Sequence, residues 1–187
     1  MKLYQIKPVD GFIQLQLKNF KEDNAAIELL AQSRTLASEW IKLETYIIAK
    51  GKKSDFPFLW AGKGTVVVSN DAKKELEKKW QDETIEFLPL SCEKEVYYLV
   101  HVIKPVDIAY MNISVDGNSK MIFNEQECLK NNLQQKGMFR AYLKGIRSFG
   151  EIMLTDKFVN SIQESSLKGF DCNVVWDSEG KYEESGK

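Results

Sequence analysis

The sequence predicts an α+β protein with mixed or antiparallel sheets and a few helices. Three observations support this prediction. A β-branched run at 65–68 is followed by polar capping residues and an amphipathic helical pattern through 80. The run EVYYLVHVI at 95–103 is the most strand-like stretch in the chain. An Asp-Gly-Asn turn signal at 116–118 lies between two further extended segments, as in a hairpin.

The N-terminal quarter indicates short strands around one helix. Residues 1–6 and 12–17 have the composition of strands, and a helix is predicted to begin at Asp23 or Asn24. Residues 40–49 alternate apolar and polar side chains, which favours a strand with one face in water. The three lysines that follow it in KGKKSD are typical of a solvated turn.

Two stretches share one design. Residues 55–90 indicate an aromatic loop, a glycine turn, a strand, a capped helix and a second strand. The strand–cap–helix–strand order returns at 151–176, where Thr155 is the predicted cap and Gly169 the helix stop. Either a duplication or a common solution reached twice would give two such similar strand–helix–strand units.

The remaining segments complete the predicted sheets. The run 95–103 lacks clean alternation, so we expect a central strand that is covered on both faces. Residues 108–123 resemble a hairpin, 124–135 a short polar helix, and 138–143 another strand. The charged, glycine-bearing residues 180–187 indicate a flexible tail.

Length and composition are those of a single soluble domain over residues 1–187. Net charge is −1, so no overall positive field argues for a nucleic acid or an anionic membrane as partner. No apolar run approaches the roughly 20 residues that span a bilayer, and the N-terminus lacks a secretory signal. The scattered cysteines, Cys92, Cys128 and Cys172, suggest reduced thiols and a cytoplasmic location.

No catalytic, cofactor or metal motif stands out. The single histidine, His101, lies between valines, where a structural strand residue is more common than a catalytic base. Asp107 follows that strand and is favoured as a turn cap. With one histidine and dispersed cysteines there is no recognised zinc spacing. We therefore expect no catalytic residue, no cofactor and no metal.

Partner binding is predicted for an aromatic loop and for acidic residues near the C-terminus. Pro57 stiffens the loop, and Trp is favoured at binding hot spots. Acidic groups can speed the encounter with a charged partner. The predicted contact residues are Phe56, Phe58, Trp60, Glu179, Glu183 and Glu184. The alternative for the loop is that Phe58 and Trp60 close one end of the core.

Four sequence motifs occur in the order in which they are found in a known protein family. They are DFPFLWAGKGTVVVSNDAKKEL, IEFLPL, YYLVHVIKPVD and IMLTDKFVNSIQESSLKGFDCNVVWDSE. Over residues 55–179 the chain resembles a bacterial immunity-protein family, the eleventh of polymorphic toxin systems, first catalogued as a domain of unknown function. Residues 1–54 are less distinctive, and the pattern is looser at His101 and at 104–107.

This resemblance implies an α+β fold without catalytic activity. It also implies that the chain is a cytoplasmic immunity protein that binds and neutralises a cognate toxin protein. Two alternatives stay open. One is an enzyme of unrecognised type with a cleft around His101 and Asp107, and the other is a regulatory binding domain unrelated to toxins.

Overall fold

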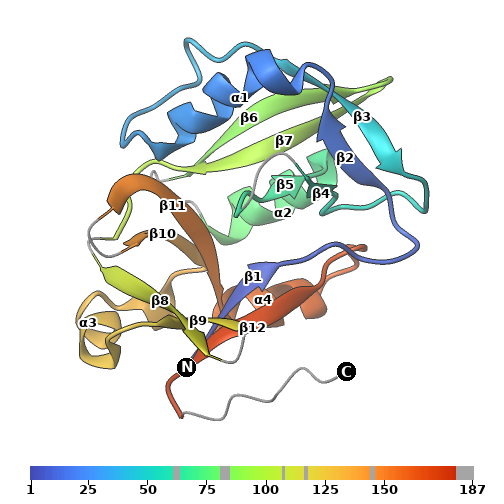
Figure 1. Cartoon of the computed structure of the whole chain (residues 1–187). Helices are drawn as coiled ribbons and strands as arrows, with labels where there is room; N and C mark the ends of the chain where they lie inside the picture. Colours follow the sequence, from blue (N-terminus) through green and yellow to red (C-terminus); the bar gives the residue numbers. More distant parts are fainter. Residues whose placement is uncertain (61–63, 81–84, 107, 116–117, 144–145, 180–187) are drawn as a thin grey trace.

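The computed structural model contains two six-stranded sheets that pack together, with helices at their faces and ends (Figure 1). It describes residues 1–60, 64–80, 85–106, 108–115, 118–143 and 146–179. The predicted α+β class is confirmed. No helix in these ranges is long and apolar enough to cross a membrane.

The first sheet is built from the two ends of the chain and the segments after residue 108. Its strands are β1 (Lys2–Ile6), β8 (Ala109–Val115), β9 (Asn118–Ile122), β10 (Met138–Leu143), β11 (Ile146–Thr155) and β12 (Cys172–Asp177). Their order is β12-β1-β11-β10-β8-β9. Only β10 and β8 pair in parallel, so the sheet is mixed. The antiparallel pairing of β8 with β9 confirms the predicted hairpin, whose turn residues 116–117 lie outside the described ranges.

The second sheet is formed by the segments between residues 14 and 102. Its strands are β2 (Gln14–Leu17), β3 (Leu43–Ala49), β4 (Phe58–Leu59), β5 (Val67–Val68), β6 (Ile85–Cys92) and β7 (Glu95–Val102). Their order is β4-β2-β3-β6-β7-β5. Leu59 of one edge strand and Val67 of the other join the same buried cluster, so the sheet curls around an inner face. We call the opposite side of this sheet its outer face.

Short helices connect the strands, and the predicted caps are present. The helices are α1 (Phe20–Glu28), α2 (Asn70–Lys79), α3 (Glu125–Lys130) and α4 (Asp156–Gln163), with 3-10 turns η1 (Leu29–Ala31) and η2 (Leu133–Gln135). The Ser69 hydroxyl accepts a hydrogen bond from the Ala72 amide at 3.1 Å, and Thr155 caps α4 in the same way.

The start of α1 differs from the prediction. The helix begins at Phe20, three to four residues before Asp23 and Asn24. The carbonyl of Asn19 already accepts hydrogen bonds from the amides of Glu22 and Asp23, at 3.1 and 2.9 Å. The N-cap is therefore Asn19, a residue type favoured at helix starts, although its side chain makes no capping hydrogen bond.

Three buried clusters form the core. One fills the curled second sheet beneath α1 and η1, and another lies between the first sheet and α3. The third joins the two sheets: Val66 and Val100 from the second meet Ile152 and Leu154 from the first. Burial at roughly 25 cal/mol per Å² of apolar surface makes this shared cluster the main attraction between the sheets.

The two predicted strand–helix–strand units have related pairings. In the first, β5 and β6 both pair antiparallel with β7, which lies between them. In the second, β11 and β12 both pair antiparallel with β1. Both helices contribute to the cluster between the sheets, through Leu76 of α2 and Phe158 of α4. A common origin of the two units stays a prediction.

Candidate functional site

The aromatic loop begins with a residue that belongs to the core. Phe56 is only 1% exposed and packs edge-on against Phe158 and Phe170, with ring centroids 6.3 and 5.1 Å away. Asp55 fixes the loop, because its main-chain amide donates to the Lys168 carbonyl and its carboxylate accepts from the Ser69 hydroxyl at 2.6 Å. Phe56 is therefore an anchor, and partner contact stays a prediction only for the rest of the loop.

Phe58 and Trp60 lie on the outer face of the second sheet. Their rings meet edge to face with centroids 5.4 Å apart, and Trp60 is 53% exposed. The indole N–H of Trp60 donates to the Gln14 amide oxygen at 2.7 Å. Its main-chain amide donates to the Leu15 carbonyl at 3.0 Å. The indole therefore has its polar group satisfied while much of its apolar surface is in water.

Strand β3 extends this exposed surface. Leu43 and Thr45 are buried, and by strand alternation Tyr46 and Ile48 point the other way, at 45% and 49% exposure. Gln16 pairs with Tyr46, and Gln14 pairs with Phe58, so the neighbouring side chains form one surface. We call this surface the outer patch: Gln14, Gln16, Tyr46, Ile48, Phe58 and Trp60.

The outer patch is exposed to solvent because α2 and the first sheet, which cover most of the rest of this face, do not extend over it. On the β5–β7–β6 side, Val68 and Val100 are buried against the first sheet and its helix. Helix α2 lies over the same side, where the Lys73 ammonium is 4.4 Å from the centre of the Tyr98 ring. No described element packs in this way on β4, β2 and β3. Exposed aromatic and aliphatic side chains gathered on one sheet face are a mark of interaction sites.

The predicted acidic contacts do not share this surface. Glu179 is exposed and follows β12, which belongs to the first sheet, whereas β3 belongs to the second sheet (Figure 1). Its main-chain amide donates to the Asp177 carboxylate at 3.0 Å. Glu183 and Glu184 lie outside the described residues.

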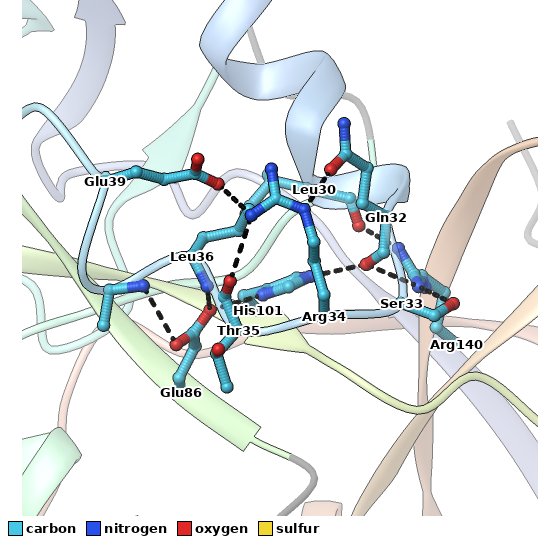
Figure 2. A network of polar contacts seen from close by, with 11 residues as sticks. Leu30, Gln32, Ser33, Arg34, Thr35, Leu36, Glu39, Glu86, His101 and Arg140 are labelled. Carbon is cyan, nitrogen blue, oxygen red and sulfur yellow. Dashed lines mark hydrogen bonds and ion pairs between the residues drawn. The ribbon is translucent and has the colours of Figure 1, made fainter.

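The single histidine is part of a buried polar network (Figure 2). His101 lies on the inner face of β7, with Nδ1 2.8 Å from a Glu86 carboxylate oxygen and Nε2 3.2 Å from the Gln32 carbonyl. The carboxylate and the carbonyl are both hydrogen-bond acceptors, and each ring nitrogen lies within hydrogen-bond distance of one of them. Glu86 also accepts from the main-chain amide of Leu36 at 2.6 Å.

Arg140 brings the first sheet into the same network. It is buried on β10 and donates to the carbonyls of Leu30 and Gln32, the latter at 3.3 Å (Figure 2). The Gln32 carbonyl thus lies within hydrogen-bond distance of both Arg140 and His101. These contacts hold the connection between η1 and β3 against both sheets, so the network has a structural role.

The sequence reasoning did not identify Glu86 and Arg140. A signal was present, because each is a charged residue within an otherwise apolar strand: IEFLPL for Glu86 and MFRAYL for Arg140. Charged side chains are almost never buried without partners. Finding the partner of Glu86 requires the register of β6 with β7, in which Glu86 lies opposite His101.

Of the groups in the alternative enzyme hypothesis, the structure describes His101 and the three cysteines, which lie on different elements. The cavity beside His101 holds about 10 Å³, room for at most about one water. Cys92 and Cys128 are in different buried clusters, and Cys172 is on β12. Burial raises the pKa of Cys128 and of Cys172 to about 11, which disfavours the reactive thiolate. Asp107 lies outside the described residues.

A larger hollow of about 280 Å³ lies between Trp80 and the Gly137 turn, and its described lining contains no histidine, cysteine or carboxylate. No three histidine, cysteine or acidic residues come close enough to hold a metal ion within the residues that the structure describes.

The fold and the exposed patch define an α+β protein with an open sheet surface. No protein-family model matches the chain, and no curated protein matches it at a significant level. The resemblance to the immunity family therefore rests on the order of the four sequence motifs.

Proposed function

We propose that this chain is an immunity protein that neutralises a cognate bacterial toxin by binding it, with no bond made or broken. The observation that carries the proposal is the outer patch, where the side chains of Trp60, Tyr46 and Ile48 are exposed on one face of the sheet. The motif order over 55–179 supplies the class of partner. The outer patch supplies the surface that would meet it.

The chemistry of the patch suits tight protein binding. Trp and Tyr are enriched among residues that dominate interface free energies. Trp60 is held by its hydrogen bond to Gln14, and Tyr46 and Ile48 lie on a paired strand. Little side-chain or main-chain freedom would be lost on docking, so less of the interaction free energy is spent on ordering.

The polar network supports binding over catalysis. Both ring nitrogens of His101 face protein acceptors, and the cavity beside the ring is too small for a substrate. A general base needs a reachable substrate proton within hydrogen-bond distance. His101 therefore acts as a positioning group for the η1–β3 connection in this proposal.

Co-expression tests the proposal directly. The chain is produced with the C-terminal domain of the large secreted protein encoded by the neighbouring gene, and growth and co-purification are measured. We expect the wild-type chain to restore growth and to co-purify with that domain. The Tyr46→Ala/Trp60→Ala variant should neither restore growth nor co-purify. Its affinity for the domain should fall by at least about tenfold, since hot-spot truncations cost roughly 2 kcal/mol or more.

The matched control is Val174→Ala, an exposed apolar residue on β12 of the first sheet. This variant should protect like the wild type. If neither rescue nor co-purification occurs with the wild-type chain, while the purified protein turns over a small molecule, the enzyme alternative replaces the proposal. Rescue without dependence on Tyr46 and Trp60 would move the binding surface elsewhere.

A further inference from the structure

Lysines border the outer patch. Lys42 immediately precedes β3, Lys50 and Lys52 follow it, and Lys94 lies in the turn between β6 and β7. All four are exposed. Within the described chain, none of them makes an ion pair or a side-chain hydrogen bond. Their charges are therefore available to a partner.

The nearest carboxylates on the same strands are already used. The Lys18 ammonium lies 2.8 Å from Glu44, and the Lys53 ammonium lies 2.9 Å from Glu95. These exposed pairs contribute little to stability. Each carboxylate already has one lysine partner, and Glu44 also interacts electrostatically with Lys42.

A local positive charge remains on a chain whose total charge is negative. Asp10 and Glu93 are acidic residues next to these lysines that make no ion pair within the described chain, so at these positions four lysines against two carboxylates leave two positive charges in excess. Asp55 and Asp71 act instead on Lys53, which is paired with Glu95. The whole chain has a net charge of −1. The outer patch is thus an apolar centre with a border of the opposite sign to the molecule.

The patch favours a protein partner over a single-stranded nucleic acid. Bases stack on aromatic rings along a continuous basic groove. Here aliphatic Ile48 lies beside Tyr46 on the same strand face, and the carboxylate of Glu44 is on that face as well. A nucleic acid has no aliphatic side chain to place over Ile48, whereas a protein surface can place an apolar side chain there and carboxylates over the lysines.

We infer that the partner of the outer patch is a protein domain with an acidic surface around an apolar centre. This inference rests on the proposed function and adds the chemistry of the toxin's contact surface. Opposite charges around an interface mainly raise the association rate and select the partner, while the buried apolar centre sets the dissociation rate. The lysine border and the aromatic centre therefore have separable effects.

Association kinetics between the purified chain and the purified toxin domain test the inference. Raising NaCl from about 50 to 500 mM should slow association by roughly tenfold or more, because exposed charges are screened over shorter distances. Lys50→Glu/Lys52→Glu should slow association about tenfold and change the dissociation rate by less than about twofold. Lys130→Glu on α3, also an exposed lysine, is the control and should bind like the wild type.

Each outcome has one meaning. Slower association of the double variant with an unchanged control supports the inference. Association that ignores both salt and the double variant, while Trp60→Ala still abolishes binding, overturns it and leaves the proposed function intact. Tight binding of a single-stranded oligonucleotide that depends on Lys50 and Lys52 also overturns it. No complex with the toxin domain under any condition removes the proposed function and this inference together.

Discussion

The outer face of the second sheet has two parts with different surroundings. On β5, β7 and β6 most of this face is covered by α2 and the first sheet, and Val68 and Val100 are buried there, although Val96 at the start of β7 is exposed. On β4, β2 and β3 the same face is in water and carries Tyr46, Ile48 and Trp60. The same alternation of side chains along the strands thus gives buried core residues in one part of this face and exposed aromatic residues in the other part. What packs against the strands decides the difference.

The aromatic loop joins the two parts and gives the strongest test of their difference. Phe56 is in the covered core, and Trp60, four residues later, is in the outer patch. Phe56→Ala should lower the free energy of unfolding by about 3–5 kcal/mol, as for other buried Phe truncations. Trp60→Ala should change it by less than about 1 kcal/mol. Urea unfolding of both variants measures this, and equal losses would contradict the assignment of Trp60 to a solvent-facing surface.

The inner face of the same sheet offers a second comparison, between a buried and an exposed carboxylate. Glu86→Ala removes the acceptor for His101 and for the Leu36 amide, and should cost about 2–3 kcal/mol in unfolding free energy. Glu39→Ala removes an exposed ion pair with Arg34 and should cost at most about 0.5 kcal/mol. A Glu86 variant as stable as the Glu39 variant would show that the network does not hold the η1–β3 connection.

Thiol labelling distinguishes the buried regions from the outer patch, and its expected effect is smaller than the stability changes above. The native Cys128 and Cys172 have a pKa raised to about 11 by burial, so at pH 8 nearly all of each thiol is protonated and unreactive. A Tyr46→Cys variant places a thiol in the outer patch. With a thiol-specific dye at pH 8, this new thiol should react at least about tenfold faster than the native ones.

The same thiols give a pH dependence with a defined sign. Their folded pKa exceeds the ordinary value, so the folded state keeps their protons longer than the unfolded state does. The stability they contribute is fully present below about pH 9 and is lost as the pH rises toward 11. The fall in unfolding free energy between pH 8 and 10.5 should be smaller in Cys128→Ala than in the wild type. A fall of equal size would mean that Cys128 is not buried in the way described.

Local features of the fold could be predicted from the sequence. The caps Ser69 and Thr155, the covered strand β7 and the β8–β9 hairpin follow from residue types a few positions apart. Such short-range signals depend on backbone hydrogen bonding and strand alternation, which a single chain segment determines. The early start of α1 at Phe20 was missed, because main-chain hydrogen bonds to Asn19 replace a side-chain cap.

The site could be predicted only in part, because burial depends on distant partners. The loop sequence does not reveal that the Phe56 ring packs against Phe158 and Phe170, whereas the Trp60 side chain contacts Gln14 and Phe58 on the exposed face. Likewise, Tyr46 and Ile48 join the outer patch through the pairing of β3 with β2. Pairings of this kind are fixed by tertiary packing, which overrides local preference.

Side-chain footprinting of the complex tests the central claim most directly. Hydroxyl radicals oxidise exposed aromatic rings, so oxidation of Trp60 and Tyr46 is compared in the free chain and in the complex with the toxin domain. We predict at least about tenfold protection of both rings on binding, as expected for residues at the desolvated centre of an interface. Unchanged oxidation of Trp60 and Tyr46 in a formed complex, with protection on β12 or α3 instead, would contradict the account.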